Sequence, residues 1–450
     1  MSFIKTGNRG NSRERLRGTL HAMAVLCTLL FAACPASAIK PPADFNDGID
    51  RSDPNFVKAS LLVMSPGDEL YSCVGHSVLR LECPKFGLDY CFTYESESAK
   101  NKVLSFLQGD LKMGMFAIPV SEHLKICAAE GRGVKQYTLN LPSDAKQRLW
   151  KYLDGKVADG VNLPYDYMKR GCAYAAFSAI SECLRPNYML QIDKWPERFD
   201  SWTRREFVDA NVDVGKYPWN RFFIHTLAGT EGDLDVPKSM KVVLSVDLLD
   251  ILQRSRVNGI PVISDKGKEL LRPTLQVSSP LITPMAIAVG ALLVSIANLF
   301  VQNLYSRWIS LAFLMFQSLA GTFFTYLVAF SNLPATSWNW LIVPFNLLPL
   351  VLWKWRKKWA LWFAGVLVLW EIGMIAYPHR LTDPAYLVLV GAYVLMYARI
   401  GWKWNRAAEP ASGGPRSAPC GPSGSLHSGN PTPTARANPV AATMGRPPAA

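Results

Sequence analysis

The stretch YSCVGHSVLRL occupies residues 71–81 and carries a single histidine, His76. From His76 to residue 83 small or apolar residues alternate with polar ones, which is the pattern of a half-buried β-strand. A second run of this kind, LDYCFTYES, follows at 88–96, and the segment CPKFG between the two runs predicts a hairpin turn. The sequence therefore places His76 at the beginning of the first strand of a β-hairpin.

Two helices are predicted further along the chain. SDAKQRLWKYLDGKV (143–157) has apolar residues at helical spacing, with Ser143 as its N-cap. CAYAAFSAISECL (172–184) is rich in alanine and apolar all round, which predicts a buried helix with Cys172 at its very start. With the strand run FVKASLLVMS before the hairpin, these elements predict a globular α+β domain over residues 55–250.

The second half of the chain has the composition of a membrane protein. Overall 49% of the 450 residues are hydrophobic, and charged residues become scarce from residue 281 to about 404. This region predicts an all-α membrane domain (281–402) with about five spans, the third of which contains two prolines and is short or broken. The candidate spans are 281–301, 308–330, 338–353, 359–377 and 385–402.

The first 38 residues predict an export signal, with a basic segment, an apolar run at 20–33 and the small residues ASA at 36–38. Cleavage after Ala38, acylation of Cys34 in the segment FAAC, and retention as an anchor are all open. Each of them sends the following linker (39–54), the globular domain and the connector (251–280) across the membrane.

The distribution of basic residues agrees with this orientation. If the globular domain is outside, the short loops and tail on the inner side carry Arg307, the cluster KWRKK at 354–358, and Lys403, as the positive-inside rule requires. The expected location is therefore a bacterial inner membrane, with the globular domain in the periplasm. The segment 403–450, rich in Pro, Gly, Ser and Ala, is expected to be a disordered cytoplasmic tail. The net charge of +13 is explained by these regions and does not indicate a nucleic-acid partner.

Cysteine usage leaves two interpretations open. Six cysteines fall in the exported region, which suggests three disulfides in an oxidising compartment, with a bridge across the hairpin as one of them; a catalytic thiol would leave an odd cysteine. These six are Cys73, Cys83, Cys91, Cys127, Cys172 and Cys183, and the hairpin bridge would join Cys83 to Cys91. No CxxC or HExxH spacing occurs, so no metal and no cofactor is expected.

Cys172 and His76 have the residue types of a nucleophile and its base. A helix N-terminus stabilises a thiolate, and a histidine on a neighbouring strand can take the thiol proton. The other two histidines of the globular domain are His123, predicted on a surface helix, and His225, predicted at a packing position. The alternative is a structural histidine and a disulfide-bonded cysteine.

Several long segments resemble the Lnb N-terminal periplasmic domain family. These segments cover roughly residues 57–350 and are LLVMSPGDELYSCVGHSVLRL (61–81), FLQGDLKMGMFAIPVSEHLKICAAEGRGVKQYTLNL (106–141), LPSDAKQRLWKYL (141–153), YDYMKRGCAYAAF (165–177) and NLPATSWNWLIVPFNLLPL (332–350). The resemblance implies a circularly permuted, NlpC-type papain-like domain, in which the histidine strand precedes the cysteine helix.

The resemblance also implies a chemistry. An Lnb-like protein would move an acyl chain from a phospholipid donor to the amino-terminal diacylglyceryl-cysteine of a lipoprotein, at the surface of the lipid bilayer. Cys172 would be the nucleophile and His76 the general base and acid. Candidates for an orienting third group are Asp68, Tyr94 and Glu95, while Arg80 would hold a phosphate or carboxylate, or be an exposed strand residue.

The chain departs from the family pattern around the cysteine. The family has asparagine before the cysteine and a threonine soon after it, whereas this sequence has Gly171 before and Ala173-Tyr174 after. Two rival functions stay open: a cell-wall amidase or endopeptidase of NlpC type, and a non-catalytic membrane protein whose cysteines are all disulfide-bonded.

Overall fold

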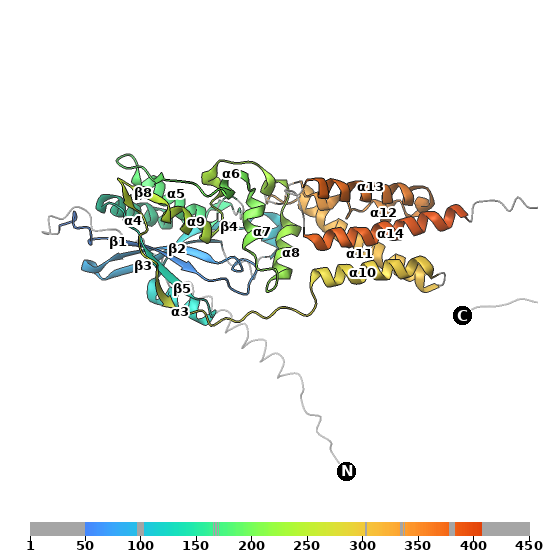
Figure 1. Ribbon diagram of the computed structural model, residues 1–450, viewed down its shortest axis with the longest axis horizontal. Helices are drawn as coiled ribbons and strands as arrows, with labels where there is room; N and C mark the ends of the chain where they lie inside the picture. The colour runs from blue at the N-terminus through green and yellow to red at the C-terminus, as the bar shows by residue number, and fades with distance from the viewer. Residues whose placement is uncertain are drawn as a thin grey trace, which may run out of the picture. The chain divides into compact units, whose positions relative to one another are not determined.

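The computed structural model describes residues 50–96, 103–164, 166, 169, 171–301, 304–333, 336, 338–377 and 383–406. The predicted signal at 1–38, all but the end of the linker and the tail from 407 onward lie outside the described residues. The described chain has a mixed α/β part followed by C-terminal helices (Figure 1).

A seven-stranded sheet organises the α/β part, in the order β10-β5-β1-β2-β3-β4-β6. Neighbouring strands pair antiparallel throughout, so the α+β class with an antiparallel sheet is confirmed. The edge strand β10 comes from the predicted connector. The strands are β1 (Lys58–Met64), β2 (His76–Cys83), β3 (Leu88–Ser96), β4 (Lys112–Pro119), β5 (Val134–Thr138), β6 (Leu163–Pro164) and β10 (Lys268–Leu271).

Helices cover both faces of this sheet. Helices α4 (Ser143–Ala158), α5 (Cys172–Leu184) and α9 (Ser245–Gln253) share a large core with one face, whereas α3 (Val120–Ala129) packs against the other. Strand alternation decides which side chain meets which helix: Leu79 belongs to the α5 core and its neighbour Val78 to the α3 core. Burial of each such aliphatic side chain contributes about 1.5–3 kcal/mol to the free energy of folding.

The predicted hairpin and cysteine helix are confirmed. Strands β2 and β3 have the predicted bounds and are joined by a 3₁₀ turn, η1 (Pro84–Phe86), that closes on Gly87 with φ 65°. Helix α5 has the predicted bounds, 172–184. The predicted N-cap of α4 is wrong: Pro142 occupies the cap, and the Ser143 hydroxyl instead donates to the backbone carbonyls of Arg51 and Asp53.

Smaller elements complete the α/β part. The helices are α2 (Val103–Gln108), α6 (Arg198–Ser201), α7 (Arg204–Asn211), α8 (Pro218–Leu227), η3 (Thr230–Asp233) and η4 (Lys238–Lys241). A small antiparallel sheet consists of β7 (Gln191–Ile192), β8 (Ser255–Val257) and β9 (Ile260–Pro261).

Three of the C-terminal helices are long and apolar enough to cross a membrane, at Tyr305–Ala329, Lys358–Ala376 and Pro384–Trp402. The predicted first span is a shorter apolar helix, and the predicted third span, with its two prolines, is divided among short helices. The elements are α10 (Pro284–Phe300), α11 (Leu304–Ala329), η6 (Trp340–Ile342), α12 (Leu348–Val351), η7 (Trp353–Trp355), α13 (Arg356–Ala376) and α14 (Pro384–Arg406).

All six cysteines of the α/β part are free thiols, five of them buried. The disulfide predicted between Cys83 and Cys91 is wrong. Cys83 belongs to the core beneath α5, and Cys91 to the core beneath α3, so the sheet itself lies between the two thiols. The hairpin spacing misled the prediction because strand alternation decides the face of each thiol.

Candidate active site

Cys172 is the first residue of α5, a helix of 13 residues. Gly171 precedes it in an extended conformation, so the helix begins abruptly at the cysteine. Unlike the other five thiols, Cys172 is partly exposed. The thiol therefore lies at the partial positive charge of a helix N-terminus, which favours a thiolate.

His76 begins β2, directly after Gly75. Gly75 has φ 82°, and a Cβ there would lie 2.9 Å from the carbonyl oxygen of Met64. Only glycine adopts this conformation without strain, which explains the Gly-His pair seen in the sequence. The turn brings the chain into the sheet at the histidine, so the imidazole is held at the end of a strand.

The structure brings His76 and Cys172 together. A side-chain hydrogen bond joins them, and the backbone N–H of Ser77 also donates to the thiol of Cys172. The Ser77 hydroxyl lies 3.9 Å from the same sulfur. The first residues of β2 and the first residue of α5 thus meet at the sulfur atom of Cys172.

The two groups hold each other in their charged forms. Burial by itself would raise the pKa of Cys172, but the charge and hydrogen bond of His76 lower it to about 7. Burial would likewise lower the pKa of His76, but the Cys172 thiolate, with a contribution from Glu95, raises it to about 10. This mutual effect is that of a thiolate–imidazolium pair, the resting form of an activated cysteine nucleophile.

Cys172 differs from every other cysteine that the structure describes. Burial raises the pKa of the remaining five thiols, to about 12 for Cys91 and about 11 for Cys183. These five thiols stay protonated at neutral pH, whereas about half of Cys172 is ionised at pH 7. The pKa values therefore distinguish Cys172 from the other five cysteines, all of which are buried.

A short relay orients the His76 ring. Its Nε2 lies 3.0 Å from Thr93 Oγ1, which donates to Glu95 Oε1 at 2.7 Å, and Nε2 lies 3.6 Å from that same carboxylate oxygen. Because Thr93 uses its proton on Glu95, its oxygen accepts from the Nε2–H of His76. This arrangement keeps a proton on Nε2 and leaves Nδ1 to serve the thiol.

Glu95 is ionised in this relay. Burial opposes its charge, but the hydrogen bond and positive charge of His76 lower the pKa of Glu95 below its ordinary value. Of the orienting residues that the sequence proposed, Glu95 is the one placed beside His76. Its hydroxyl intermediary, Thr93, was not among them.

The other residues proposed from the sequence lie elsewhere. Tyr94 faces the opposite side of β3 and packs against the core that contains α5, and Asp68 is exposed in the turn before His76. Arg80 pairs with Asp89 through two hydrogen bonds of 2.8 Å and donates to Gln136. It lines an open pocket of about 590 Å³ at the far end of β1 and β2 from His76.

His123 is buried, with 5% of its surface exposed, so its predicted place on a surface helix is wrong. It lies on the inner face of α3, 3.7 Å from the Cys127 sulfur. Burial and the positive charge of His76 lower the pKa of His123, which keeps it neutral. His225 is buried as predicted, where it bonds Asp209.

Ser77 and Thr93 are the site residues that the sequence did not indicate. Both are common polar residues inside strands, and single-residue patterns do not distinguish them from packing positions. The hairpin register does contain a signal for Thr93. The observed pairing ends with Leu79 opposite Phe92, and the same register extended by three residues would set His76 opposite Glu95. Thr93, two residues before Glu95, then faces the same side.

We expect iodoacetamide to alkylate Cys172 with a pH midpoint near 7. Because the pKa is lowered, the thiolate is present above this pH and is lost as the pH falls through it. Peptide mass spectrometry after timed labelling measures the rate at each pH. Cys91 and Cys183 serve as internal controls that remain unlabelled; a midpoint near 9 would contradict the ion pair.

Replacing Thr93 by valine tests the relay with a side chain of the same shape. Valine neither accepts from His76 nor donates to Glu95, so we expect the alkylation midpoint of Cys172 to rise and the alkylation rate at neutral pH to fall by about 10-fold. The Thr93→Ser variant keeps the hydroxyl and should retain the wild-type midpoint. Equal behaviour of the two variants would show that Thr93 only fills space.

The described residues provide no obvious place for a metal ion. Among them, no group of three or more His, Cys, Asp or Glu side chains is gathered in a way that could hold one.

Residues 45–205 match the family model described as the Lnb N-terminal periplasmic domain. The matched segment contains His76, Thr93, Glu95 and Cys172, and it confirms the resemblance up to residue 205; the resemblance at 332–350 lies outside the match. The match indicates a periplasmic domain of the Lnb type in this part of the chain. No curated protein and no solved structure matches the chain.

Proposed function

We propose, from the premise that residues 45–205 match an Lnb-type periplasmic domain, that this protein is a membrane-bound cysteine acyltransferase. It N-acylates the amino-terminal diacylglyceryl-cysteine of lipoproteins with an acyl chain from a phospholipid. The observation that carries the proposal is the Cys172–His76 pair, in which one thiol has its pKa lowered to about 7. The apolar C-terminal helices support a substrate that resides in a bilayer.

The first half-reaction forms a thioester. The Cys172 thiolate attacks the ester carbonyl carbon of the donor lipid, and the tetrahedral intermediate collapses with cleavage of the carbon–oxygen bond. The imidazolium of His76 gives its proton to the departing alkoxide, so a lyso-lipid alcohol leaves and neutral imidazole remains.

The second half-reaction transfers the acyl chain to nitrogen. The α-amino group of the acceptor attacks the thioester carbonyl, and the carbon–sulfur bond breaks to return the thiolate. Imidazole takes the proton that the amine loses, which restores the starting ion pair. The acceptor's amine therefore reacts only after the first product has formed, a ping-pong order.

The start of α5 also supplies donors for the oxyanion. The backbone N–H of Cys172 belongs to the first turn, where helix geometry provides no intrahelical acceptor. When the Cys172 thiolate adds to the ester carbonyl, the oxyanion of the tetrahedral intermediate forms close to this donor and to the positive end of the helix dipole. The start of α5 would thus stabilise the tetrahedral intermediate.

The proposed location is the bacterial inner membrane, crossed several times, with the catalytic domain in the periplasm and the tail in the cytoplasm. The three helices of membrane-crossing length support the first part. The basic cluster at the start of α13, which includes Lys354 and Arg356, supports the orientation.

Complementation of a strain that lacks its lipoprotein N-acyltransferase tests the function. We expect the wild-type protein to restore N-acylation of a model lipoprotein, scored by mass spectrometry of its amino-terminal peptide. Lipoprotein that stays unacylated while purified muropeptides are cut would favour the cell-wall hydrolase instead.

Restoring the family's asparagine tests whether its loss impairs the site. Gly171 has φ −72°, which any residue adopts, and a Cβ there would lie 3.5 Å from the nearest atom, the carbonyl oxygen of Val243. We expect Gly171→Asn to fold, to gain a few tenths of a kcal/mol from helix capping, and to keep the Cys172 alkylation midpoint. Thermal unfolding and labelling measure the two effects. A Gly171→Asn variant with lower Tm would show that the glycine is required here.

A further inference from the structure

Helix α8 contacts residues next to three of the C-terminal helices. Trp219 donates from its indole nitrogen to the carbonyl of Ile282, just before α10, at 2.8 Å. The Thr226 hydroxyl lies 2.6 Å from the Tyr386 hydroxyl on α14, and Asn339, between α11 and η6, donates to the Thr226 carbonyl at 2.7 Å. Helix α8, which has ten residues, thus contacts the segment before α10, the first turn of α14 and the segment before η6.

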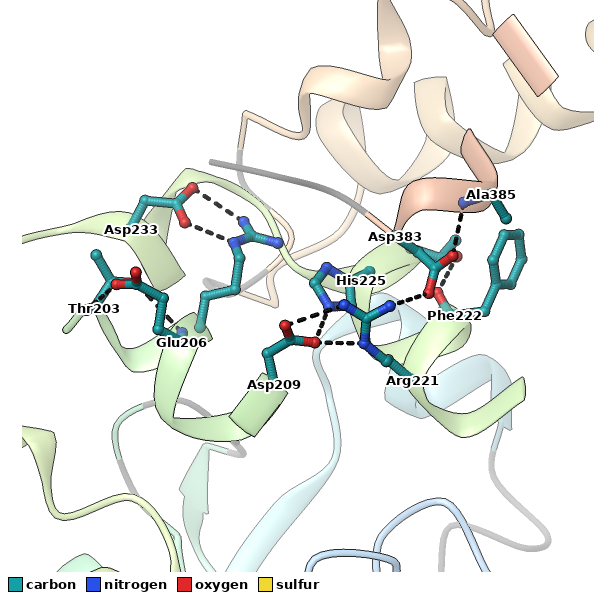
Figure 2. A network of polar contacts seen from close by, with 11 residues as sticks. Thr203, Glu206, Asp209, Arg221, Phe222, His225, Asp233, Asp383 and Ala385 are labelled. Carbon is teal, nitrogen blue, oxygen red and sulfur yellow. Dashed lines mark hydrogen bonds and ion pairs between the residues drawn. The ribbon is translucent and has the colours of Figure 1, made fainter. Parts of the chain in front are cut away.

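An ion-pair network crosses the same contact. Figure 2 shows the Arg221 guanidinium between the carboxylates of Asp209 on α7 and Asp383. Arg221 donates to Asp209 at 2.6 and 3.1 Å and to Asp383 at 2.9 Å, while His225 bonds Asp209 at 2.9 Å. Asp383 in turn accepts from the backbone N–H of Ala385 and so caps the start of α14.

These groups are largely withdrawn from solvent. The side chain of Arg221 is 15% exposed and that of Asp383 is 9% exposed. Phe222 stacks on Tyr386 beside them, with ring centroids 4.6 Å apart. Removing one partner of such a pair leaves the other charged and buried, which is strongly unfavourable, so the contact depends on the whole network.

The contact lies at the end of a helix that is long and apolar enough to cross a membrane. Asp383 immediately precedes the membrane-crossing segment Pro384–Trp402. Phe223 on α8 is 46% exposed, and Trp219 packs close to it, with ring centroids 5.9 Å apart. Exposed aromatic residues beside the end of a span are typical of the headgroup layer.

The α7–α8 unit also reaches the active-site loop. Cys73, three residues before His76, is buried in a cluster with Val208 on α7 and with Tyr217, the N-cap of α8. The turn that delivers the histidine therefore packs on the same helices that hold the membrane end.

We propose that α8 lies in the headgroup layer and that Arg221, held between Asp209 and Asp383, positions the catalytic domain so that Cys172 meets a bilayer-resident lipid ester. Arg221 is a positioning residue and takes no part in bond making. The inference rests on the proposed acyl transfer for its lipid substrate, but the alkylation of Cys172 reports on the site without it.

The Asp383→Asn variant tests this inference in the full-length protein, reconstituted in phosphatidylglycerol–phosphatidylethanolamine vesicles. We expect acyl transfer from the vesicle lipid to fall by about 10²-fold, because the thiol is no longer held at the correct height. The rate and pH midpoint of Cys172 alkylation should not change. Asp383→Glu restores the carboxylate and should recover most of the transfer.

Asp233→Asn is the matched control. Asp233 is as buried as Asp383 and pairs with Arg205 on α7 at 2.6 Å, but this pair lies within the α/β part of the chain. The Asp233→Asn variant also removes one buried carboxylate, and its rate of acyl transfer should stay within about 2-fold of the wild type. Equal losses in the Asp233 and Asp383 variants would overturn the positioning role, as would a parallel loss of Cys172 alkylation.

Hydrogen–deuterium exchange separates this inference from the proposed function. If α8 is held by Asp383, the Asp383→Asn variant exchanges faster across 218–227 and unchanged across 172–184, even if the wild-type protein transfers no acyl chain. Unchanged exchange in α8 would overturn the inference. Faster exchange in α8 with no transfer by the wild type would refute the proposed function alone.

Discussion

Replacing Cys172 by alanine is expected to abolish acyl transfer, with a loss on the order of 10⁴-fold or more. Alanine has no nucleophile, so no thioester forms, and water cannot substitute for it in a ping-pong transfer to an amine. The small side chain fits the first turn of α5, and the protein should fold normally. The measurement is N-acylation of a model lipoprotein, together with trapping of the acyl-enzyme by mass spectrometry.

Cys183→Ala is the matched control for this variant. Cys183 lies on the same helix but is buried, and burial raises its pKa to about 11. Its removal deletes a thiol without touching the site, so acyl transfer should persist even if stability falls by about 1 kcal/mol. An active Cys172→Ala protein, or an inactive Cys183→Ala protein, would refute the assignment of the nucleophile.

Replacing His76 by alanine is expected to lower acyl transfer by about 10³-fold. Two effects combine: the leaving alkoxide loses its proton donor, and the thiol loses the charge that lowers its pKa. With His76 absent, burial raises the pKa of Cys172 to above its ordinary value of 9.0. The thiolate fraction at pH 7 then falls from about one half to about one hundredth or less.

Cys172 alkylation measures the second effect separately. In the His76→Ala variant its rate at pH 7 should drop by about 50-fold, and the pH midpoint should move upward from 7. The double variant with Cys172→Ala should be no less active than Cys172→Ala alone, because the two groups act as one unit. An unchanged alkylation midpoint in His76→Ala would show that another group lowers the pKa of the thiol.

The sequence predicted the local elements of the site well. Alternation predicted β2 and β3, and the apolar composition predicted α5, with Cys172 at its first residue. Such patterns are reliable because they depend on neighbours a few residues apart. The Gly75-His76 pair was visible too, although the reason for the glycine, a positive φ against the Met64 carbonyl, came from the structure.

The orienting group was only partly predictable. Glu95 and Tyr94 were proposed together, yet adjacent strand residues face opposite sides, so at most one could meet His76. Thr93 was missed because a threonine in a strand ordinarily serves packing. The disulfide between Cys83 and Cys91 failed for a related reason: sequence spacing does not say which face of a sheet a thiol occupies.

The burial of His123 and the network around Arg221 were likewise beyond sequence patterns. His123 follows Glu122 and lies two residues before Lys125, and both of these charged residues are exposed even though the face of α3 that carries His123 is buried. Arg221 and Asp383 are 162 residues apart, and only the packing of α8 against α14 brings them to 2.9 Å.

By itself, the sequence determined the class of domain, the apolar helices, and the strand and helix that carry His76 and Cys172, because periodicity and composition are properties of short segments. Tertiary structure alone decided that the two meet, that Thr93 and Glu95 contact the histidine, and that one thiol of the six has a lowered pKa. Ser77 and Cys172, which now touch, are 95 residues apart in the chain. A pKa depends on the charges and burial around an atom, and these exist only once the sheet and its helices have packed.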